Sequence, residues 1–156
     1  MRKRPGLFNA SLAIDIAVLA PDNITAARSI MTLDITPMVA SGRKIVTSYG
    51  DGLFRFGMEK AEGSILLFST EVLAWPHTEI DSVDENAFAE VIARAGEIDI
   101  LLLGMGARMQ PVKTAWRNAL RPHGIVIEPM DTGAACRTFN VLQSEERRVA
   151  AALIAV

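Results

Sequence analysis

Two loops in the second half of the sequence carry most of the residues whose chemistry could serve a ligand. Residues 104–110 (GMGARMQ) and 129–137 (PMDTGAACR) each follow an apolar run of strand composition. Glycine-rich turns and helix N-termini offer backbone N–H groups to anions, and arginine adds a charged donor. The candidate ligand-binding residues are therefore Gly104, Gly106, Arg108, Asp131, Thr132, Gly133, Cys136 and Arg137. If neighbouring parallel strands deliver the two loops, Arg108 and Arg137 could converge on one anion.

The first loop matches a dinucleotide-binding motif only in part. Gly104 and Gly106 follow a predicted strand, and Glu128 ends the next one, where a ribose-binding acid would stand. However, Met109 occupies the position of the third glycine, where its side chain would obstruct the helix–sheet contact that the motif needs. The sequence therefore favours a strand-to-helix turn whose glycines allow positive φ.

The second loop contains the tetrapeptide Asp-Thr-Gly-Ala of aspartic proteases, at residues 131–134. In those enzymes two such carboxylates share a proton. Here a helix-forming stretch follows at once, so the context favours Asp131 as a helix N-cap that accepts from the N–H of Gly133 or Ala134.

Cys136 is the only cysteine, and it falls in the first turns of the same predicted helix. The helix dipole and the adjacent Arg137 would both lower the pKa of its thiol, which would make it a candidate nucleophile. Only His77 and His123 could act as an imidazole base, and neither lies at a recognisable catalytic or metal-ligand spacing. We therefore predict no catalytic residue, no metal and no cofactor, and we favour a binding protein over an enzyme.

A basic stripe follows the first loop. Lys113, Arg117 and Arg121 recur every four residues on the predicted helix face away from Trp116, and Arg108 precedes them. A solvated helix face is the ordinary explanation, and a surface for an anionic partner is the alternative. Aromatic residues make up only 6% of the chain, so we expect no nucleic-acid partner.

The elements that must position these loops are predicted by hydrophobic patterning. Residues 45–49 and 53–56 flank Gly-Asp-Gly and read as a hairpin, with Phe54 and Phe56 facing the core. Further strands are predicted at residues 64–68, 98–103, 125–128 and 149–156. One helix is predicted after a capping box formed by Ser82 and Glu85, and a second has Pro111 in its first turn. A third helix is predicted to run from Asp131 to about Ser144. This order predicts an α/β fold with a largely parallel sheet, extended by the antiparallel hairpin.

Length and charge are consistent with one soluble domain. The 156 residues include 16 Lys and Arg and 18 Asp and Glu, a formal charge of −2. We interpret residues 1–35 as an N-terminal extension, with a short helix near residues 9–19, and residues 36–156 as a single domain. Asp15 inside the first apolar run argues against a secretory signal. We expect a cytoplasmic protein, with the mitochondrial matrix as the alternative because the chain starts with basic residues.

Several segments together resemble the Mth-type domain family, also known as domain of unknown function 498. They are YGDGLFRF (49–56), GSILL (63–67), WP (75–76), IDILLLGMG (98–106), GIVIEPMDTGAACRTFN (124–140) and VAAALI (149–154). The match runs from about Met31 to the end of the chain. Leu53 stands where the family commonly has a second glycine.

The resemblance implies a three-layered α/β fold with a mixed central sheet and no established enzymatic reaction. Mitochondrial members of the family include an assembly factor of NADH dehydrogenase (complex I). The resemblance therefore implies a non-enzymatic binding or assembly module whose partner is a respiratory complex subunit or a second assembly factor. Membrane association is expected only through such a partner, and a homo-oligomer is a further option. The alternative is a small-molecule protein or enzyme that uses the two loops.

Overall fold

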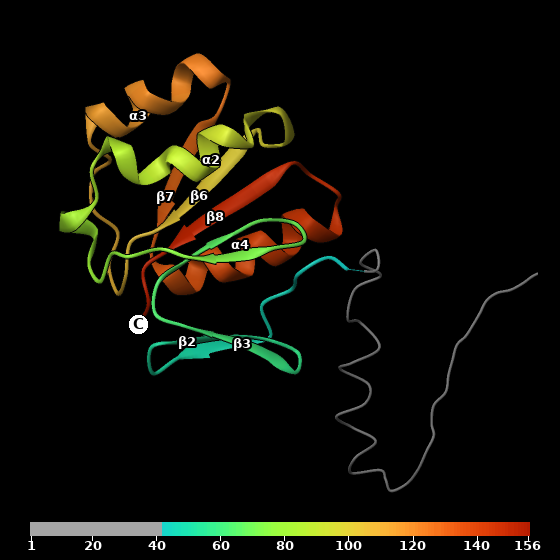
Figure 1. Ribbon diagram of the computed structural model, residues 1–156. Helices are drawn as coiled ribbons and strands as arrows, with labels where there is room; N and C mark the ends of the chain where they lie inside the picture. Colours follow the sequence, from blue (N-terminus) through green and yellow to red (C-terminus); the bar gives the residue numbers. More distant parts are fainter. Residues whose placement is uncertain (1–41) are drawn as a thin grey trace, which may run out of the picture. The chain divides into compact units, whose positions relative to one another are not determined.

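The computed structural model describes residues 42–156, which form a five-stranded sheet and a smaller three-stranded sheet (Figure 1). The strands are β1 (Ser48–Gly50), β2 (Leu53–Phe56), β3 (Glu59–Glu62), β4 (Ile65–Leu67), β5 (Val72–Ala74), β6 (Ile100–Gly104), β7 (Val126–Met130) and β8 (Val149–Leu153). The helices are α2 (Ala89–Ala93), α3 (Thr114–Leu120) and α4 (Thr132–Ser144), with short 3₁₀ turns η2 (Ile80–Ser82), η3 (Glu85–Phe88), η4 (Ala95–Glu97) and η5 (Arg121–His123). The predicted extension and its helix lie outside the described residues.

The larger sheet has the strand order β5-β4-β8-β6-β7 and is mixed. Strand β6 pairs in parallel with both β7 and β8, whereas β4 pairs antiparallel with β5 and β8. All five residues of β8 are buried, because the strand lies in the middle of the sheet and both faces are covered. The prediction of a strand for this alanine-rich segment is confirmed.

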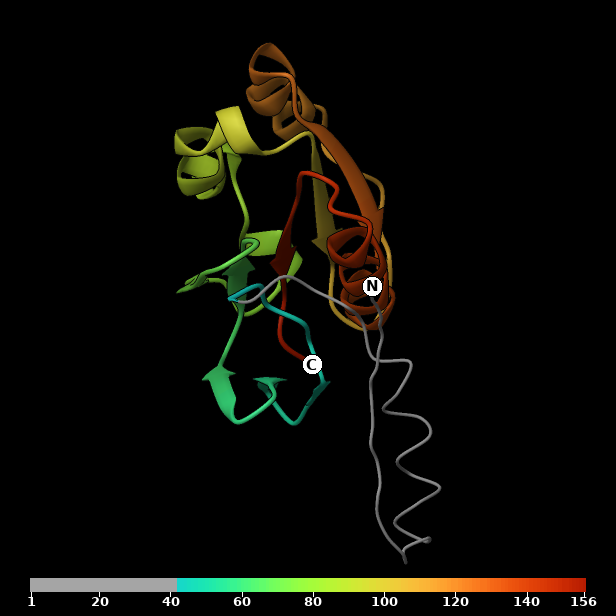
Figure 2. The ribbon, with the colours of Figure 1, turned by 90° about the vertical axis from the view of Figure 1, so that its right-hand side faces the viewer.

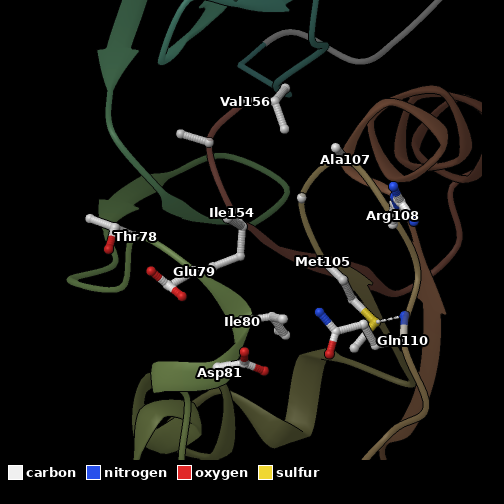
Figure 3. Close-up of a pocket in the computed structure, with 12 residues that line it drawn as sticks. Thr78, Glu79, Ile80, Asp81, Met105, Ala107, Arg108, Gln110, Ile154 and Val156 are labelled. Atoms are coloured by element: carbon white, nitrogen blue, oxygen red, sulfur yellow. Dashed lines mark hydrogen bonds between the residues drawn. The ribbon is translucent and has the colours of Figure 1, made fainter.

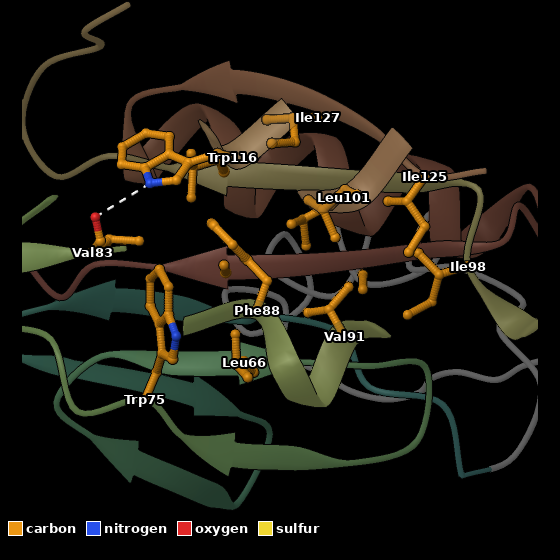
Figure 4. Packing of buried hydrophobic residues seen from close by; sticks show 14 of the residues in the cluster. Leu66, Trp75, Val83, Phe88, Val91, Ile98, Leu101, Trp116, Ile125 and Ile127 are labelled. Atoms are coloured by element: carbon orange, nitrogen blue, oxygen red, sulfur yellow. Dashed lines mark hydrogen bonds between the residues drawn. The ribbon is translucent and has the colours of Figure 1, made fainter. Parts of the chain in front are cut away.

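Two hydrophobic clusters, one on each face of this sheet, confirm the predicted three layers. On one face, Phe88 and Trp116 from the α2 and α3 side pack over Leu101 (Figure 4). The centres of their rings lie 6.2 Å apart in an edge-on arrangement. The Trp116 indole N–H donates to the Val83 carbonyl at 3.2 Å. On the other face, Phe139 of α4 and Phe54 of β2 belong to one buried cluster with the strands. Figure 2 shows α4 and the helices of the first layer on opposite sides of the strands.

The hairpin at residues 48–56 is confirmed, but its place in the fold differs from the prediction. Strand β2 pairs with β1 and with a third strand, β3, so the ribbon forms a sheet of its own rather than an extension of the larger one. Strand β3 was missed because its sequence, Glu-Lys-Ala-Glu, has no apolar alternation. Strand β5 was missed because it is only three residues long and adjoins an irregular stretch.

The capping box predicted Ser82 as the N-cap residue, and this prediction is wrong. Asp84 caps η3, with its carboxylate accepting from the N–H groups of Asn86 and Ala87. The Ser82 hydroxyl instead donates to the Glu79 carbonyl at 2.9 Å, because Ser82 belongs to the preceding turn. The predicted single helix is therefore divided into η3, α2 and η4.

The next helix also begins later than predicted. Lys113 has an extended backbone (φ −70°, ψ 140°), so α3 starts at Thr114 and Pro111 stands outside it. The Lys113 ammonium lies 5.2 Å from the centre of the Trp116 ring. The basic stripe consequently does not turn wholly away from Trp116, because the long lysine side chain folds over the indole.

Helix α4 also holds the segment that leads into β1. The Asn140 side chain accepts from the Val46 N–H and donates to the Val46 carbonyl, both at 2.8 Å, as a neighbouring strand would. Three residues along, the amide of the fully buried Gln143 donates to the carbonyls of Lys44 (3.1 Å) and Ser69 (2.9 Å). Side-chain amides therefore connect α4 to two segments that are distant in the sequence.

Candidate functional site

The two candidate loops lie side by side at the carboxyl edge of the parallel strands. Gly104 of β6 is in register with Met130 of β7. Beyond the strands, the Met105 N–H donates to the Met130 carbonyl and the Thr132 N–H to the Gly106 carbonyl, both at 2.9 Å. The predicted juxtaposition of the loops is confirmed, and it comes from parallel pairing of neighbouring strands.

Thr132 is a buried hub between these loops and the end of β8. Its hydroxyl accepts from the Gly106 N–H at 2.9 Å and donates to the Ile154 carbonyl at 2.7 Å. Gly106 has a φ of +94°, which an L side chain rarely adopts. The Gly106 N–H is already satisfied inside the protein, so it does not face a ligand.

Gly104 is required by packing. A Cβ at this position would lie 2.9 Å from the Leu153 Cδ2 atom and 3.1 Å from the Thr132 Cα atom. The missing side chain therefore lets α4 approach β6 and β8 closely.

The first turn of α4 is occupied by residues of the chain itself. The Asp131 carboxylate accepts from the Ala134 N–H at 2.8 Å, which confirms the predicted N-cap. A Cβ on Gly133 would collide with the hydroxyl of Tyr49, and that hydroxyl accepts from the Arg137 guanidinium at 3.2 Å. Tyr49 was absent from the sequence-based candidates, because only the folded hairpin brings β1 against α4.

A pocket of about 500 Å³ opens beside the first loop (Figure 3). Ile80, Met105 and Ile154 form its apolar part, and Glu79, Asp81 and Arg108 are its charged residues. Figure 3 shows Glu79 and Arg108 on opposite sides of the opening. Arg137 is not among the residues that line this pocket. Two carboxylates against one guanidinium also give the pocket a surplus of negative charge.

Cys136 is buried in the hydrophobic cluster that α4 shares with the hairpin. Burial raises the pKa of its thiol to about 12, and the Arg137 charge opposes this shift without overcoming it. The predicted lowering of the pKa is therefore wrong, because desolvation of the thiolate outweighs the nearby cation. At neutral pH the thiol stays protonated, which is the unreactive form.

This shift predicts a pH dependence of stability. The folded pKa is raised above 9.0, the ordinary pKa of a cysteine thiol, so the folded state keeps the thiol proton that the unfolded state loses. The contribution of the Cys136 thiol to the free energy of unfolding is fully present below pH 9, and it is lost as the pH rises toward 12. Between about pH 9 and pH 10 the wild type should lose about 1 kcal/mol more unfolding free energy than Cys136→Ala. Urea denaturation of both chains at each pH measures this difference, and parallel curves would contradict the assignment.

The two histidines of the chain do not reach Cys136 through any hydrogen bond in the described region. The His77 Nδ1 atom lies 3.0 Å from the Ser82 hydroxyl, and its ring packs edge-on against Trp75. His123 is exposed in η5. Between residues 42 and 156 there is no group of three or more His, Cys, Asp or Glu side chains placed to hold a metal ion.

Comparison with known proteins identifies a family that covers the described sheets and helices. The family model described as "Protein of unknown function (DUF498/DUF598)" matches residues 46–154, which include every strand of the described region. The chain belongs to this family. The family predicted from the sequence is thereby confirmed.

Two relatives and one solved structure illustrate the membership. An uncharacterized protein of Rhodobacter capsulatus is 36% identical over 73% of the chain and 86% of its own length. The zebrafish (Danio rerio) "NADH dehydrogenase [ubiquinone] 1 alpha subcomplex assembly factor 3" is 29% identical over 79% of the chain and 71% of its own length. A solved structure from Bartonella henselae, described as an outer membrane protein, is 35% identical, covers 74% of the chain and 97% of its own, and has a TM-score of 0.69. In residues 42–156 of this family member, none of the helices has the length and apolar character needed to cross a bilayer.

Proposed function

We propose that the chain is a non-enzymatic protein-binding module that assists the assembly of respiratory NADH dehydrogenase. The observation that carries this proposal is its similarity to proteins named as assembly factors of that enzyme, which extends over 79% of the chain for the zebrafish relative. Three features of the two candidate loops are then explained by folding alone. Gly104 permits packing, Thr132 joins the loops, and Asp131 caps α4.

The chemistry of the two loops supports binding rather than catalysis. The thiol of Cys136 is protonated and buried, and the Gly106 N–H is already engaged by Thr132. The Arg137 guanidinium donates a hydrogen bond to the Tyr49 hydroxyl. A general base within hydrogen-bonding distance of a nucleophile is the usual requirement for covalent catalysis, and the loops do not assemble one. We place the module in the cytoplasm, or in the mitochondrial matrix if its source is eukaryotic.

Deletion of the gene tests the proposal directly. Cells that lack the protein should contain less assembled NADH dehydrogenase, because an assembly factor raises the yield of the complex without being part of its chemistry. Native gel electrophoresis with in-gel NADH oxidation measures the assembled enzyme, and expression of the wild-type chain should restore it. Unchanged amounts and activity in the deletion strain would refute the respiratory role.

A matched variant separates binding from catalysis in the same strain. Cys136→Ala removes the only thiol but leaves the surface unchanged, since Cys136 is 2% exposed. The variant should restore the complex as well as the wild type does. A folded Cys136→Ala chain that fails to restore it would indicate that the thiol reacts.

A small-molecule site is the second candidate, and the pocket beside the first loop favours it. Its volume of about 500 Å³ lies within the range of ligand sites. Thermal denaturation with inorganic phosphate, nucleotides, carboxylates and amines tests it, because a ligand at 100 times its Kd adds about 2.7 kcal/mol. A shift that Arg108→Ala abolishes would support an anion, and a shift that Glu79→Gln abolishes would support an amine. Unchanged melting with all four classes would exclude this candidate.

A further inference from the structure

In the helical layer formed by η3, α2, η4, α3 and η5, exposed basic side chains lie on one group of elements and exposed acidic side chains on another. We define the basic ridge as Lys113, Arg117 and Arg121, which are exposed and recur every four residues. No acidic residue occurs between residues 100 and 127. Among the residues that the structure describes, no member of the ridge forms an ion pair, whereas Lys44, Arg94 and Arg148 all do. The ridge therefore offers positive charge that the described part of the molecule does not neutralise.

The exposed charged side chains of η3 and η4 are acidic. We define the acidic strip as Glu85 of η3 and Glu97 of η4, which are exposed and form no ion pair within residues 42–156. Ala89 and Ala93 follow Glu85 at four-residue intervals and are exposed as well. Small side chains on the exposed surface of α2 leave room for a second helix to approach.

The ridge and the strip belong to one packed unit. Phe88 of η3 packs against Trp116 of α3, and both rings are buried beneath the layer. Lys113 is held over Trp116, so the start of the ridge has a defined position. No ion pair joins the strip to the ridge in the described region, so neither charge neutralises the other there.

A surface with one positive and one negative side is complementary to itself after a two-fold rotation. The ridge of one copy then meets the strip of the other, and the same contact occurs twice. We propose that two copies of this chain associate through this helical layer, with α3 and η5 of each copy facing η3, α2 and η4 of its partner. This inference does not depend on the proposed respiratory role.

A second copy fits this surface better than a polyanion does. Nucleic acid or an anionic membrane would be attracted by the ridge but repelled by the adjacent strip. Phe88 and Trp116 are both buried, so the layer offers no exposed phenylalanine, tyrosine or tryptophan ring for stacking on bases. The opposite charge that the ridge requires is present on the same chain.

Sedimentation velocity of the full chain across a concentration series tests the association. At low salt the protein should form a dimer, and the dimer should dissociate as salt is added, because exposed charges are screened within about 8–10 Å near physiological ionic strength. The ridge variant Arg117→Glu/Arg121→Glu and the strip variant Glu85→Lys/Glu97→Lys should each weaken the dimer at least about tenfold, because like charges then face each other. Arg55→Glu, an exposed cation on β2 without an ion pair in residues 42–156, is the matched control and should leave dimerisation unchanged.

Mixing the two variants gives the decisive result. The reversed ridge of one variant should attract the reversed strip of the other, while their unaltered ridge and strip keep the original contact. A heterodimer should therefore form from two variants that are each monomeric. Circular dichroism checks that both are folded, and the neutral variants Arg117→Ala/Arg121→Ala and Glu85→Ala/Glu97→Ala replace any that is not, with a smaller loss of dimer expected.

Three outcomes would overturn the proposal. They are a wild-type chain that stays monomeric at low salt throughout the series, a dimer that the ridge and strip variants leave intact, and a mixture of folded variants that remains monomeric. Binding of the wild type to duplex DNA or to phosphatidylglycerol vesicles, lost in the ridge variant while no dimer is seen, would assign the ridge to a polyanion instead.

Discussion

Thr132→Val should lower the free energy of unfolding by about 2–5 kcal/mol. Valine has nearly the same shape as threonine, but it leaves the buried Gly106 N–H and the Ile154 carbonyl without their partner. Each buried polar group left unsatisfied costs about 1–3 kcal/mol. Urea denaturation followed by circular dichroism measures the loss.

Two further variants show whether the hydroxyl is responsible. Thr132→Ser keeps the hydroxyl and should recover most of the stability. Thr138→Val makes the same replacement on the same helix, at a half-buried position whose hydroxyl has no hydrogen bond within the described residues, and should change stability by less than about 1 kcal/mol. Equal losses in Thr132→Val and Thr138→Val would show that helix propensity, and not the hub, causes the effect.

Gln143→Met should cost about 2–4 kcal/mol, because it removes a buried amide that hydrogen-bonds to Lys44 and Ser69. Its Nε2 donates to the Lys44 and Ser69 carbonyls, and its Oε1 accepts from the Ser69 hydroxyl at 3.1 Å. Methionine has a similar volume and adds no new polar group. Ser144→Ala, at the exposed neighbour whose hydroxyl bonds only within α4, should change stability by less than about 0.5 kcal/mol.

The loss in Gln143→Met should also be local. Lys44 leads into β1 and Ser69 follows β4, so the amide holds these segments against α4. Hydrogen exchange should therefore accelerate in β1, β2 and β3 more than in β6 and β8. Uniform acceleration throughout the molecule would show that Gln143 supports the whole core rather than this attachment.

Much of the fold could be predicted from local patterns. Asp131 is a good N-cap, an apolar strand precedes it, and the following residues form helix well, so α4 was predicted within about a residue at each end. Strands β6 and β8 were predicted because continuous apolar runs of this length are stable only when covered on both faces. Strands β3 and β5 carry no such signal, since pairing with a neighbour and not their own composition makes them strands.

The candidate site was predicted less completely, for a related reason. Parallel pairing of β6 and β7 follows from the order of elements, so the two loops could be expected at one edge. The contact of Tyr49 with Gly133 and Arg137, and the pocket wall formed by Glu79 and Asp81, depend on segments far from both loops in the sequence. The spacing of residues along the sequence does not predict such long-range contacts.

The sequence by itself determined the family, the order of the elements and the cap of α4, because these depend on residue type and short-range spacing. Only the tertiary structure decided the chemical state of Cys136 and the contact of Arg137 with Tyr49. Along the chain, Arg137 and a helix start favour a lowered pKa for the Cys136 thiol. In three dimensions the surrounding apolar side chains exclude water, and the free energy of desolvating a thiolate exceeds its attraction to one partly solvated cation.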